Sequence, residues 1–231
     1  MALLVTRVRA QRLARAVAFA VVLGVPVAAL AYAVRAQVTP VVSFDEAAVS
    51  AATAVTREDP ALRAVLIAWQ EAFQAKWVNL AVTLLCVWVW RRPGLRSRAL
   101  WAFVTLMTTW ALGLGAKYLV QRGRPMVEDA VAHAPGYSFP SGHAMNTAAA
   151  GVTLTLLVWP LLGGRGRAVT VTVVTAAVLL TGADRVMLGV HYPSDVVAGF
   201  LLGSAMAGAS YLGWTGWNPV HHDDDEKGGP S

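Results

Sequence analysis

The residues that could do chemistry in this chain lie in three short segments, each at the edge of an apolar stretch. The first, KYLVQRGRP, contains Lys117 and Arg124; the second, PSGH, ends at His143; the third, DRVMLGVHYPSD, contains His191 and Asp195. Cations, a histidine at a helix start and a histidine paired with a carboxylate are groups that phosphoryl transfer uses. Each segment alone also fits a structural role, so the interpretation depends on all three meeting at one site.

Lys117 and Arg124 are suited to hold a phosphoryl group. They stand seven residues apart, close to two helical turns, so both can lie on one face of a helix. Pro125 disfavours helical backbone at Arg124, which places this arginine where the helix ends. A lysine supplies a point charge, whereas an arginine fork can grip two oxygens. The alternative is that both are cationic side chains that reach the membrane surface from a helix end.

The PSGH segment has the features of an anion site at the start of a helix. Ser141 is a natural N-cap, and Gly142 lets the backbone approach a ligand closely. The free N–H groups and the dipole of such a terminus attract anions. His143 then lies in the first turn, beside the anion. The alternative is a plain cap with one partly buried histidine.

The third segment combines a guanidinium group with a histidine and a carboxylate. Arg185 is a second fork, and His191 precedes Asp195 by four residues. If Pro193 begins a helix, Asp195 lies in its first turn and can accept the N–H of one ring nitrogen of His191. That contact would fix the tautomer and leave the other nitrogen free to attack. Taken by itself, the pair also fits a structural hydrogen bond.

The elements that must position these residues are membrane helices. The chain has 231 residues, of which 56% are hydrophobic and 14% charged, and the apolar residues come in long blocks. Because a bilayer core about 30 Å thick requires roughly 20 apolar residues per helix, we predict an all-α, polytopic membrane protein with six transmembrane helices. Gly199 and Gly203, in the sixth of these helices, favour close helix packing. The expected spans are Ala16–Val34, the membrane half of Pro60–Trp90, Ala99–Val120, Ala144–Leu162, Ala168–Ala183 and Val196–Leu212.

The second span is expected to belong to one long helix over Pro60–Trp90. Polar residues within Glu71–Lys76 interrupt its apolar character, so its outer half should be amphipathic and its membrane half should begin near Ala72. Asp59 is suited to cap this helix, and a proline suits its first position.

The basic residues indicate the orientation of the spans. Arginine-rich segments precede the first span, join the second to the third and join the fourth to the fifth, and the positive-inside rule places these ends in the cytoplasm. Both termini are then cytoplasmic, and the three chemical segments lie on the extracytoplasmic side. The net charge of +6 is explained by this topology, and no nucleic-acid surface is indicated. The arginines concerned are Arg7, Arg9, Arg12, Arg15, Arg91, Arg92, Arg96, Arg98, Arg165 and Arg167.

The rest of the chain indicates no second domain. Residues 1–215 are expected to form a single six-span unit, and residues 216–231 a polar tail that is disordered and cytoplasmic. His221 and His222 could bind a metal, but a solvated tail is the preferred interpretation. The single cysteine, Cys86, excludes an intrachain disulfide and a cysteine-based zinc site. The first apolar run also fits a cleaved signal peptide, although its length and the spans that follow favour a membrane helix.

In order and spacing, the three segments resemble the type 2 phosphatidic acid phosphatase superfamily, which also includes the vanadium haloperoxidases. The family pattern is K-x6-R-P, then P-S-G-H, then S-R-x5-H-x3-D, and the matching stretch runs from Lys117 to Asp195, about a third of the chain. One position departs from the pattern, because Asp184 stands where the family has serine. This carboxylate could weaken anion binding nearby or could pair with Arg185.

The resemblance implies a metal-independent phosphatase without a cofactor, in which His191 attacks phosphorus and becomes phosphohistidine. It implies further that Asp195 orients His191, and that His143 protonates the leaving oxygen and then activates water. The phosphate oxygens would be held by Lys117, Arg124, Arg185 and the backbone groups of Ser141 and Gly142.

A site at the outer level of a bacterial-type plasma membrane suggests a lipid phosphate that arrives sideways from the leaflet. Family members of this compact type commonly act on polyprenyl diphosphates or phosphatidylglycerol phosphate, and we expect an undecaprenyl-type diphosphate. Phosphatidylglycerol phosphate or phosphatidate is the alternative, followed by a lipid phosphotransferase or a non-catalytic scaffold. The loop Val120–Phe139, with Glu128, Asp129, His133 and Tyr137, is expected to shape access to the site. The sequence indicates no obligate protein partner.

Overall fold

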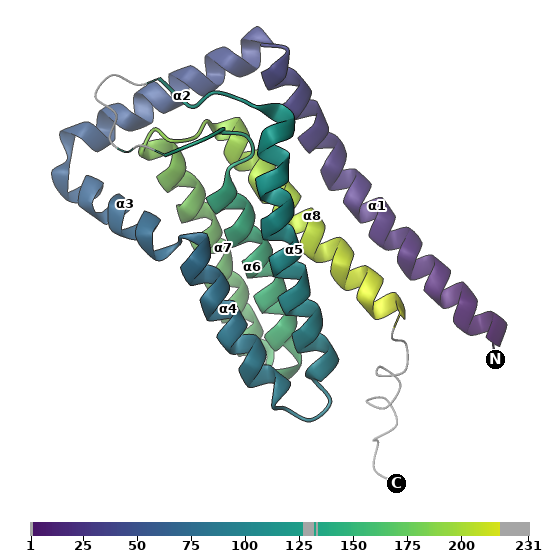
Figure 1. Ribbon diagram of the computed structural model, residues 1–231. Coiled ribbons are helices and arrows are strands. Elements are labelled where there is room, and N and C mark those ends of the chain that lie inside the picture. Colours follow the sequence, from purple (N-terminus) through teal and green to yellow (C-terminus); the bar gives the residue numbers. More distant parts are fainter. Residues whose placement is uncertain (1, 127–131, 133, 218–231) are drawn as a thin grey trace.

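The computed structural model describes residues 2–126, 132 and 134–217, and it shows an all-helical protein (Figure 1). Within these residues there are eight α-helices, one short 3-10 helix (η1) and no strand. A bundle of long helices is covered at one end by α2 and α3, which run across it (Figure 1). The helices are α1 (Ala2–Arg35), α2 (Thr39–Glu58), α3 (Pro60–Ala72), α4 (Ala75–Trp90), α5 (Arg96–Val120), α6 (Gly142–Val158), η1 (Trp159–Leu161), α7 (Gly164–Met187) and α8 (Pro193–Trp217).

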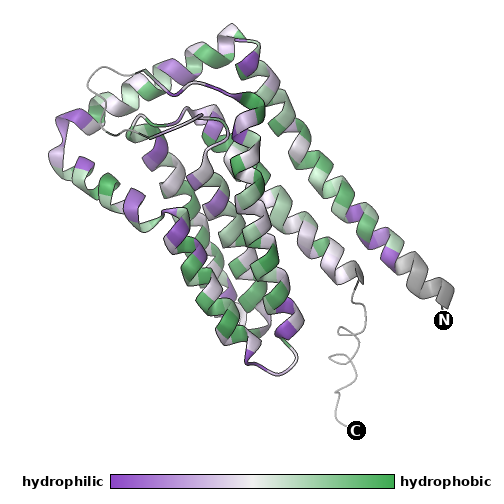
Figure 2. Ribbon diagram, viewed as in Figure 1, coloured by the Kyte–Doolittle hydropathy of each residue, from purple (hydrophilic) through white to green (hydrophobic). Residues whose placement is uncertain are grey.

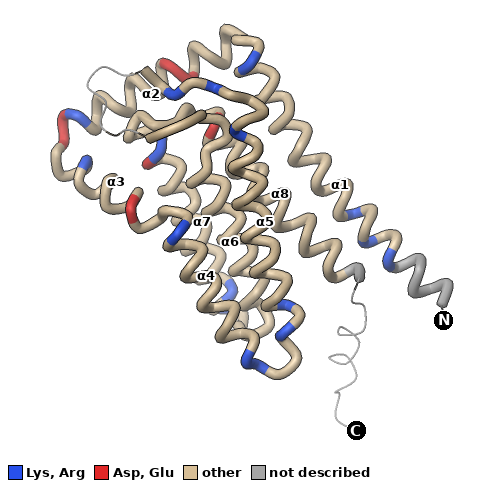
Figure 3. Tube along the Cα trace, in the orientation of Figure 1, with Lys and Arg blue, Asp and Glu red and all other residues tan. Residues whose placement is uncertain are grey.

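The predicted all-α, membrane-spanning architecture is confirmed. In the described part of the chain, five helices are long and apolar enough to cross a membrane, and the bent pair of α3 and α4 makes a sixth candidate. Figure 2 shows that the shafts of the bundle helices are largely hydrophobic. In Figure 3 the acidic residues lie toward the end that α2 and α3 cover, together with several basic residues, whereas the coloured residues in the turn between α4 and α5 at the other end are all basic. The two ends of the bundle therefore differ in charge.

The single helix predicted for Pro60–Trp90 is wrong, because the chain bends by 50° between α3 and α4. Phe73 leaves the helical conformation, and its ring stacks on the indole of Trp69 with 4.2 Å between centroids. Nε1 of Trp69 also donates to the hydroxyl of Thr181 in α7, 3.1 Å away. This contact holds α3 across the end of α7 while α4 enters the bundle. The predicted cap is confirmed, since the carboxylate of Asp59 accepts two N–H groups from the first turn of α3.

Helix α2 lies in a region, residues 39–58, for which no element is predicted. The hydroxyl of Thr56 donates to the carbonyl oxygen of Met187 at 2.9 Å and so fastens α2 to the end of α7. Small polar residues interleave with the apolar ones of this helix, which hides its amphipathic face from a search for membrane spans. The buried residues, spaced three or four apart along one face, are Asp45, Val49, Thr53 and Thr56.

Two glycines bring α8 against the start of α6, as predicted for the Gly199 and Gly203 pair. A Cβ at Gly203 would lie 2.3 Å from the carbonyl oxygen of Met145, and a Cβ at Gly199 would lie 2.8 Å from that of Ser141. No side chain tolerates such separations, so glycine is required for this approach. The contact places the first turn of α8, with Asp195, next to the first turn of α6.

Helix α1 packs along α8 over most of its length (Figure 1). Nη1 of Arg12 donates to the carbonyl oxygen of Thr215 at 2.8 Å, and a Cβ at Gly208 would lie 2.4 Å from the ring of Phe19. Helix α8 continues to Trp217, two residues beyond the domain limit predicted at residue 215. The rest of the predicted tail, with His221 and His222, lies outside the described residues.

Candidate active site

The three segments predicted to carry chemistry meet at the end of the bundle that α2 and α3 cover. His191, in the turn between α7 and α8, has its Nε2 3.2 Å from Nη1 of Arg124, which follows α5. The other ring nitrogen, Nδ1, lies 3.4 Å from Oδ2 of Asp195 in the first turn of α8. The start of α6, with His143, adjoins them through Ser141, whose N–H donates to the carbonyl oxygen of Asp195 at 3.0 Å. Segments that are distant in the chain therefore surround one imidazole.

The turn that presents His191 is held by backbone hydrogen bonds. The N–H groups of Val190 and His191 both donate to the carbonyl oxygen of Arg185 at 3.2 Å. Gly189 adopts a φ of 69°, which a residue with a Cβ reaches only under strain. His191 is only 3% exposed. The turn therefore presents a buried ring with little freedom to move.

The neighbours of His191 decide where its proton lies. An arginine side chain can only donate, so Nε2 accepts from Arg124 and the proton of the neutral ring is on Nδ1, facing Asp195. At 3.4 Å the ring and the carboxylate interact electrostatically, although Nδ1 lacks a well-aligned hydrogen bond. Burial lowers the pKa of His191 to about 4, and Asp195 opposes part of that shift. The ring is therefore neutral at pH 7, with Nε2 as the candidate nucleophile.

Two residues without a predicted role, Arg122 and Asp45, anchor Asp195. Nη1 of Arg122 lies 2.7 Å from Oδ1 of Asp195, and its Nη2 lies 2.7 Å from Oδ2 of Asp45 in α2. The second oxygen of Asp195 accepts the N–H of Tyr192 at 3.0 Å. Arg122 stands within the first segment but outside the residues that the family pattern specifies. The only sequence signal for Asp45 is that it and Glu46 are adjacent carboxylates in an otherwise largely apolar stretch. The partner of Asp45 is known only once α2 is placed.

Two of the three cations expected to bind phosphate, Lys117 and Arg124, donate to carbonyl oxygens of the protein itself. Lys117 donates from Nζ to the carbonyl oxygen of Tyr137 at 2.8 Å. Burial lowers the pKa of Arg124 from its usual value, and the nearby charge of Arg185 adds to this effect. A phosphate offers charged acceptors, which are stronger than carbonyl oxygens, and can replace them. The carbonyl oxygens that accept from Arg124 belong to Pro135, Gly136, Tyr137 and Val190.

Asp184, which occupies the serine position of the family pattern, pairs with Arg185. Nε of Arg185 donates to Oδ2 of Asp184 at 2.8 Å, and Nη2 forms an ion pair with the same oxygen. Both side chains are almost fully buried. Of the two outcomes expected for this carboxylate, pairing is the one that the structure shows. A phosphate must therefore share Arg185 with a resident carboxylate.

The first turn of α6 differs in one respect from the expected anion site. The hydroxyl of Ser141 accepts the N–H of Ala144 at 3.5 Å, as expected of a cap. The backbone N–H of Ser141, however, donates to the carbonyl oxygen of Asp195 and is therefore not free to bind an anion. A Cβ at Gly142 would lie 3.8 Å from Cε of Lys117, so the lysine side chain passes over this glycine. Gly142 thus adjoins one of the candidate cations, while Ser141 ties α6 to α8.

A cavity of about 160 Å³ adjoins His143 inside the bundle. The ring of His143 interacts with the main chain of Gln70 in α3, and its Nε2 is buried without a hydrogen-bond partner. The amide of Asn146, one turn further along α6, has no partner at either nitrogen or oxygen, although the residue is 3% exposed. Unpaired buried polar atoms are costly, so these groups mark a place for a ligand or water. The lining includes Trp110, Gly113, Lys117, Gly142, His143 and Asn146.

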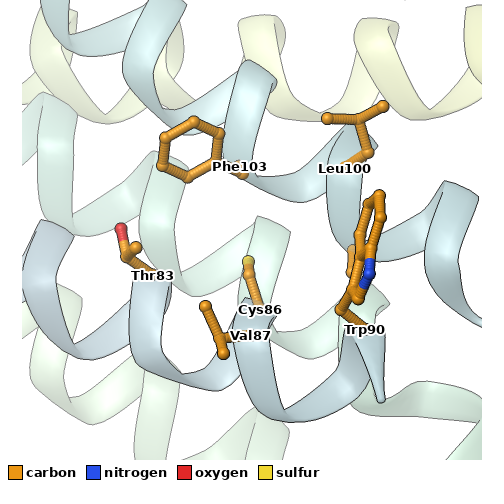
Figure 4. Close-up of a pocket in the computed structure, with 7 residues that line it drawn as sticks. Thr83, Cys86, Val87, Trp90, Leu100 and Phe103 are labelled. Carbon is orange, nitrogen blue, oxygen red and sulfur yellow. The ribbon is translucent and has the colours of Figure 1, made fainter. Parts of the chain in front are cut away.

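A second pocket, of about 400 Å³, lies between α4 and α5 (Figure 4). It carries no charged side chain and contains Cys86 as a small buried group. Among the described residues, no three His, Cys, Asp or Glu side chains are grouped as metal ligands. Glu128, Asp129 and His133 of the predicted access loop lie outside those residues. The pocket is lined by Thr83, Cys86, Val87, Trp90, Ala99, Leu100 and Phe103.

Residues 98–218 match the PAP2 superfamily. The chain is 38% identical over 90 residues to phosphatidylglycerophosphatase B of Bacillus subtilis (strain 168), covering 38% of this chain and 43% of the relative. It is 32% identical over 135 residues to an undecaprenyl-diphosphatase of Sulfolobus acidocaldarius, covering 55% of this chain and 58% of the relative. The chain thus spans about half the length of these curated relatives.

The fold is similar to the crystal structure of a transmembrane PAP2-type phosphatidylglycerolphosphate phosphatase from Bacillus subtilis. The TM-score is 0.76 at 25% sequence identity, over 88% of this chain and 98% of that chain. The family match covers more than half of the chain and contains the whole stretch from Lys117 to Asp195. The resemblance noted in the three segments is therefore confirmed, and the chain belongs to the PAP2 superfamily.

Proposed function

We propose that the protein is a membrane lipid phosphatase that transfers a phosphoryl group first to His191 and then to water. The observation that carries the proposal is the environment of His191, a neutral ring with Nε2 beside Arg124 and Nδ1 facing Asp195. The names of two relatives, phosphatidylglycerophosphatase B and undecaprenyl-diphosphatase, support the same class of reaction.

The proposed reaction has two steps. In the first, the lone pair on Nε2 of His191 attacks phosphorus, the bond to the leaving oxygen breaks, and His143 gives that oxygen a proton. The phosphorylated ring becomes cationic, and Asp195 stabilises it through the proton on Nδ1. In the second, neutral His143 takes a proton from the water that attacks phosphorus, and the bond from phosphorus to Nε2 breaks. Phosphate leaves, and both histidines return to their starting states.

Three cations are assigned to the charge on the phosphoryl oxygens. Lys117, Arg124 and Arg185 interact electrostatically with one another or with the two histidines, so they share one region. A pair of unit charges at 4 Å is worth about 4 kcal/mol at an effective dielectric constant of about 20. Such cations, together with the start of α6 at Gly142, can supply the stabilisation that phosphoryl transfer needs. The proposed reaction therefore uses no metal ion or cofactor.

The proposed substrate is an undecaprenyl-type diphosphate in the outer leaflet of a bacterial-type plasma membrane. The arginines of the turn between α4 and α5 lie at the end of the bundle opposite the site (Figure 3), which supports an extracytoplasmic site and cytoplasmic termini. The leaving group of this reaction is a prenyl phosphate, whose chain must remain in the bilayer. The cavity beside His143 lies on the membrane side of that histidine, and we assign the unpaired amide of Asn146 to an oxygen of the leaving group.

Phosphatidylglycerol phosphate is the second candidate substrate. The names of the Bacillus subtilis relative and of the similar solved structure favour it. Its leaving group carries hydroxyl and ester oxygens that the amide of Asn146 can also bind. The two candidates differ in whether the group next to the leaving oxygen is a phosphate or an alcohol.

The experiment that tests the function is phosphate release by the purified full-length protein in a chelator. A panel of undecaprenyl diphosphate, phosphatidylglycerol phosphate and phosphatidate, with and without an alcohol acceptor, identifies the substrate and separates hydrolysis from phosphotransfer. His191→Ala and His143→Ala serve as inactive controls. Hydrolysis that persists without His191, or that requires an added divalent ion, would overturn the mechanism.

A further inference from the structure

We propose that Asp45 and Arg122 form a positioning clamp that holds Asp195, and through it His191, in the orientation needed for attack. The inference rests on the proposed function, because it concerns the same nucleophile. The clamp joins three elements that are far apart in the chain: α2, the loop after α5, and the first turn of α8.

The contacts of Arg122 use both ends of its fork. Nη1 donates to Oδ1 of Asp195 and to Oγ of Ser194, each at 2.7 Å, and Nη2 donates to Oδ2 of Asp45 at 2.7 Å. Oδ1 of Asp45 accepts the N–H of Ser194 at 3.0 Å, and its Oδ2 accepts the hydroxyl of the same serine. The ring of Tyr192 covers the guanidinium, with 4.0 Å between Cζ and the ring centroid. The arginine is thus fixed on several sides.

This network determines which oxygen of Asp195 faces His191. Oδ1 is engaged by Arg122, so Oδ2 is the oxygen that remains for the imidazole and for the N–H of Tyr192. A rotation of the carboxylate would break both sets of contacts. A planar fork enforces such an orientation, which a single point charge does not.

Burial argues that the clamp has a task beyond joining helices. The side chains of Asp45 and Asp195 are fully buried, and that of Arg122 is 8% exposed. Burying three charges is expensive, and apolar side chains join helices at no such cost. Although burial opposes it, the two carboxylates raise the pKa of Arg122 above its usual value, so the clamp stays charged.

The clamp also changes the electrostatic potential at His191, because its members carry opposite charges. Arg122 offsets part of the charge of Asp195, and Asp45 in turn offsets part of the charge of Arg122. Removing Arg122 should therefore raise the proton affinity of His191, and removing the charge of Asp45 should lower it. The other groups that face the histidine stay constant in such variants. They are Lys117 from α5, Arg124 from the following loop and His143 from α6, while Arg185 from α7 acts on Arg124 and His143.

The test compares kcat, KM and the pH dependence of kcat/KM for Arg122→Gln, Arg122→Lys and Asp45→Asn in the full-length protein. We expect kcat to fall by about 10–100-fold in Arg122→Gln and by less in Asp45→Asn, with KM changed by less than about threefold. The acid limb of kcat/KM should move to higher pH in Arg122→Gln and to lower pH in Asp45→Asn. In Arg122→Lys the acid limb should lie close to that of the unaltered protein, while kcat stays reduced. Lysine keeps the positive charge but lacks the planar guanidinium that binds both carboxylates.

A matched control is Arg98→Gln, which removes another buried arginine that donates to a carbonyl oxygen, that of Leu156 at 2.6 Å, near the opposite end of the bundle. It should lower thermal stability and leave the pH profile unchanged. The double variant Asp45→Asn/Arg122→Gln should have the pH profile of Arg122→Gln, since Asp45 acts through the arginine. Acid limbs that move in the same direction, or variants that lose stability while keeping kcat and the pH profile, overturn the clamp. Failure of the proposed function gives a different result from failure of the clamp. In that case the unaltered protein either releases no phosphate or releases it equally well after His191→Ala.

Discussion

Nε2 of His191 lies 3.2 Å from Nη1 of Arg124, although 67 residues separate them in the chain. Because a guanidinium group only donates hydrogen bonds, this contact identifies Nε2 as the nitrogen that carries the lone pair of the neutral ring. In the proposed mechanism Nε2 is the nucleophile, and Arg124 also binds the phosphoryl oxygens. Substrate must draw the guanidinium from the ring and from the surrounding carbonyl oxygens toward those oxygens.

Replacing His191 by alanine should reduce phosphate release by about 10⁴-fold or more, as expected for loss of a nucleophile. The protein should also no longer retain radioactive phosphate when it is quenched in alkali during turnover, a condition under which phosphohistidine survives. Thermal unfolding of the variant checks that it is folded. Covalent label that persists in His191→Ala would show that another group is the nucleophile.

The acid limb of kcat/KM should lie well below the ordinary histidine range. His191 attacks only when unprotonated, and burial lowers its pKa to about 4. Activity should therefore persist as the pH falls through about 6.5, the usual histidine value, and decline as it approaches 4. The same shift stabilises the folded state above the unfolded pKa, and this contribution is lost as the pH falls toward 4. Unfolding measured at each pH separates the two effects, and a limb centred near 6.5 would contradict a buried, neutral ring.

Asp184→Ser, which restores the residue of the family pattern, should strengthen substrate binding and weaken the fold. Asp184 is the resident partner of Arg185, so its removal frees the guanidinium for phosphate. We expect KM, or the inhibition constant of inorganic phosphate, to fall about 3–10-fold, and stability without ligand to fall by about 1–3 kcal/mol because a buried cation loses its partner. Asp184→Asn, which keeps the shape and removes the charge, should behave similarly. An unchanged phosphate affinity in both variants would mean that Arg185 does not reach the ligand.

Asn146→Leu should lower kcat/KM by about tenfold for substrates whose leaving group carries an oxygen beside the cleaved bond. Leucine has the same branched arrangement of heavy atoms but cannot pair with that oxygen, whereas the amide of Asn146 is unpaired in this structure. A prenyl diphosphate should be affected, and a phosphate monoester of a simple long-chain alcohol should not. Equal losses on both substrates would indicate a packing role for Asn146.

Gly203→Ala should destabilise the protein by about 1–3 kcal/mol, the range expected of overpacking. Its Cβ would lie 2.3 Å from the carbonyl oxygen of Met145, so α8 must move away from α6 and carry Asp195 with it. Activity should fall together with the transition temperature in detergent. Gly213→Ala in the same helix is the matched control, since a Cβ there meets nothing within 4 Å. If the two variants are equally stable, the close packing of α6 and α8 is not required.

Several features of the fold follow from local sequence. Apolar blocks predict membrane helices because the bilayer core demands a set length of apolar surface. Helix starts can likewise be predicted from residues such as Ser141 and Asp59, whose side chains cap the helices that follow them. These features depend on neighbouring residues and not on distant contacts, so the sequence alone predicts them.

Other features depend on contacts between distant segments. The chain bends by 50° between α3 and α4, and the contact of Trp69 with Thr181 that holds α3 in place is recorded in no local pattern. The role of Asp45 follows only from the position of α2 across the end of the bundle, which brings Asp45 into contact with Arg122. Likewise, Gly199 lets α8 approach the start of α6, and there the backbone N–H of Ser141 donates to the carbonyl oxygen of Asp195 in α8.

The sequence by itself determined which residue types are available and which helices carry them, because hydrophobicity, periodicity and capping act over a few turns. Local spacing also allowed the pairs of His191 with Asp195 and of Asp184 with Arg185, which the structure shows. Only the tertiary structure decided the pairs between distant segments: His191 with Arg124, and Arg122 with Asp45 and Asp195. The physical reason is that a buried charge takes its properties from the groups packed around it, and in this protein those groups come from helices far apart in the chain.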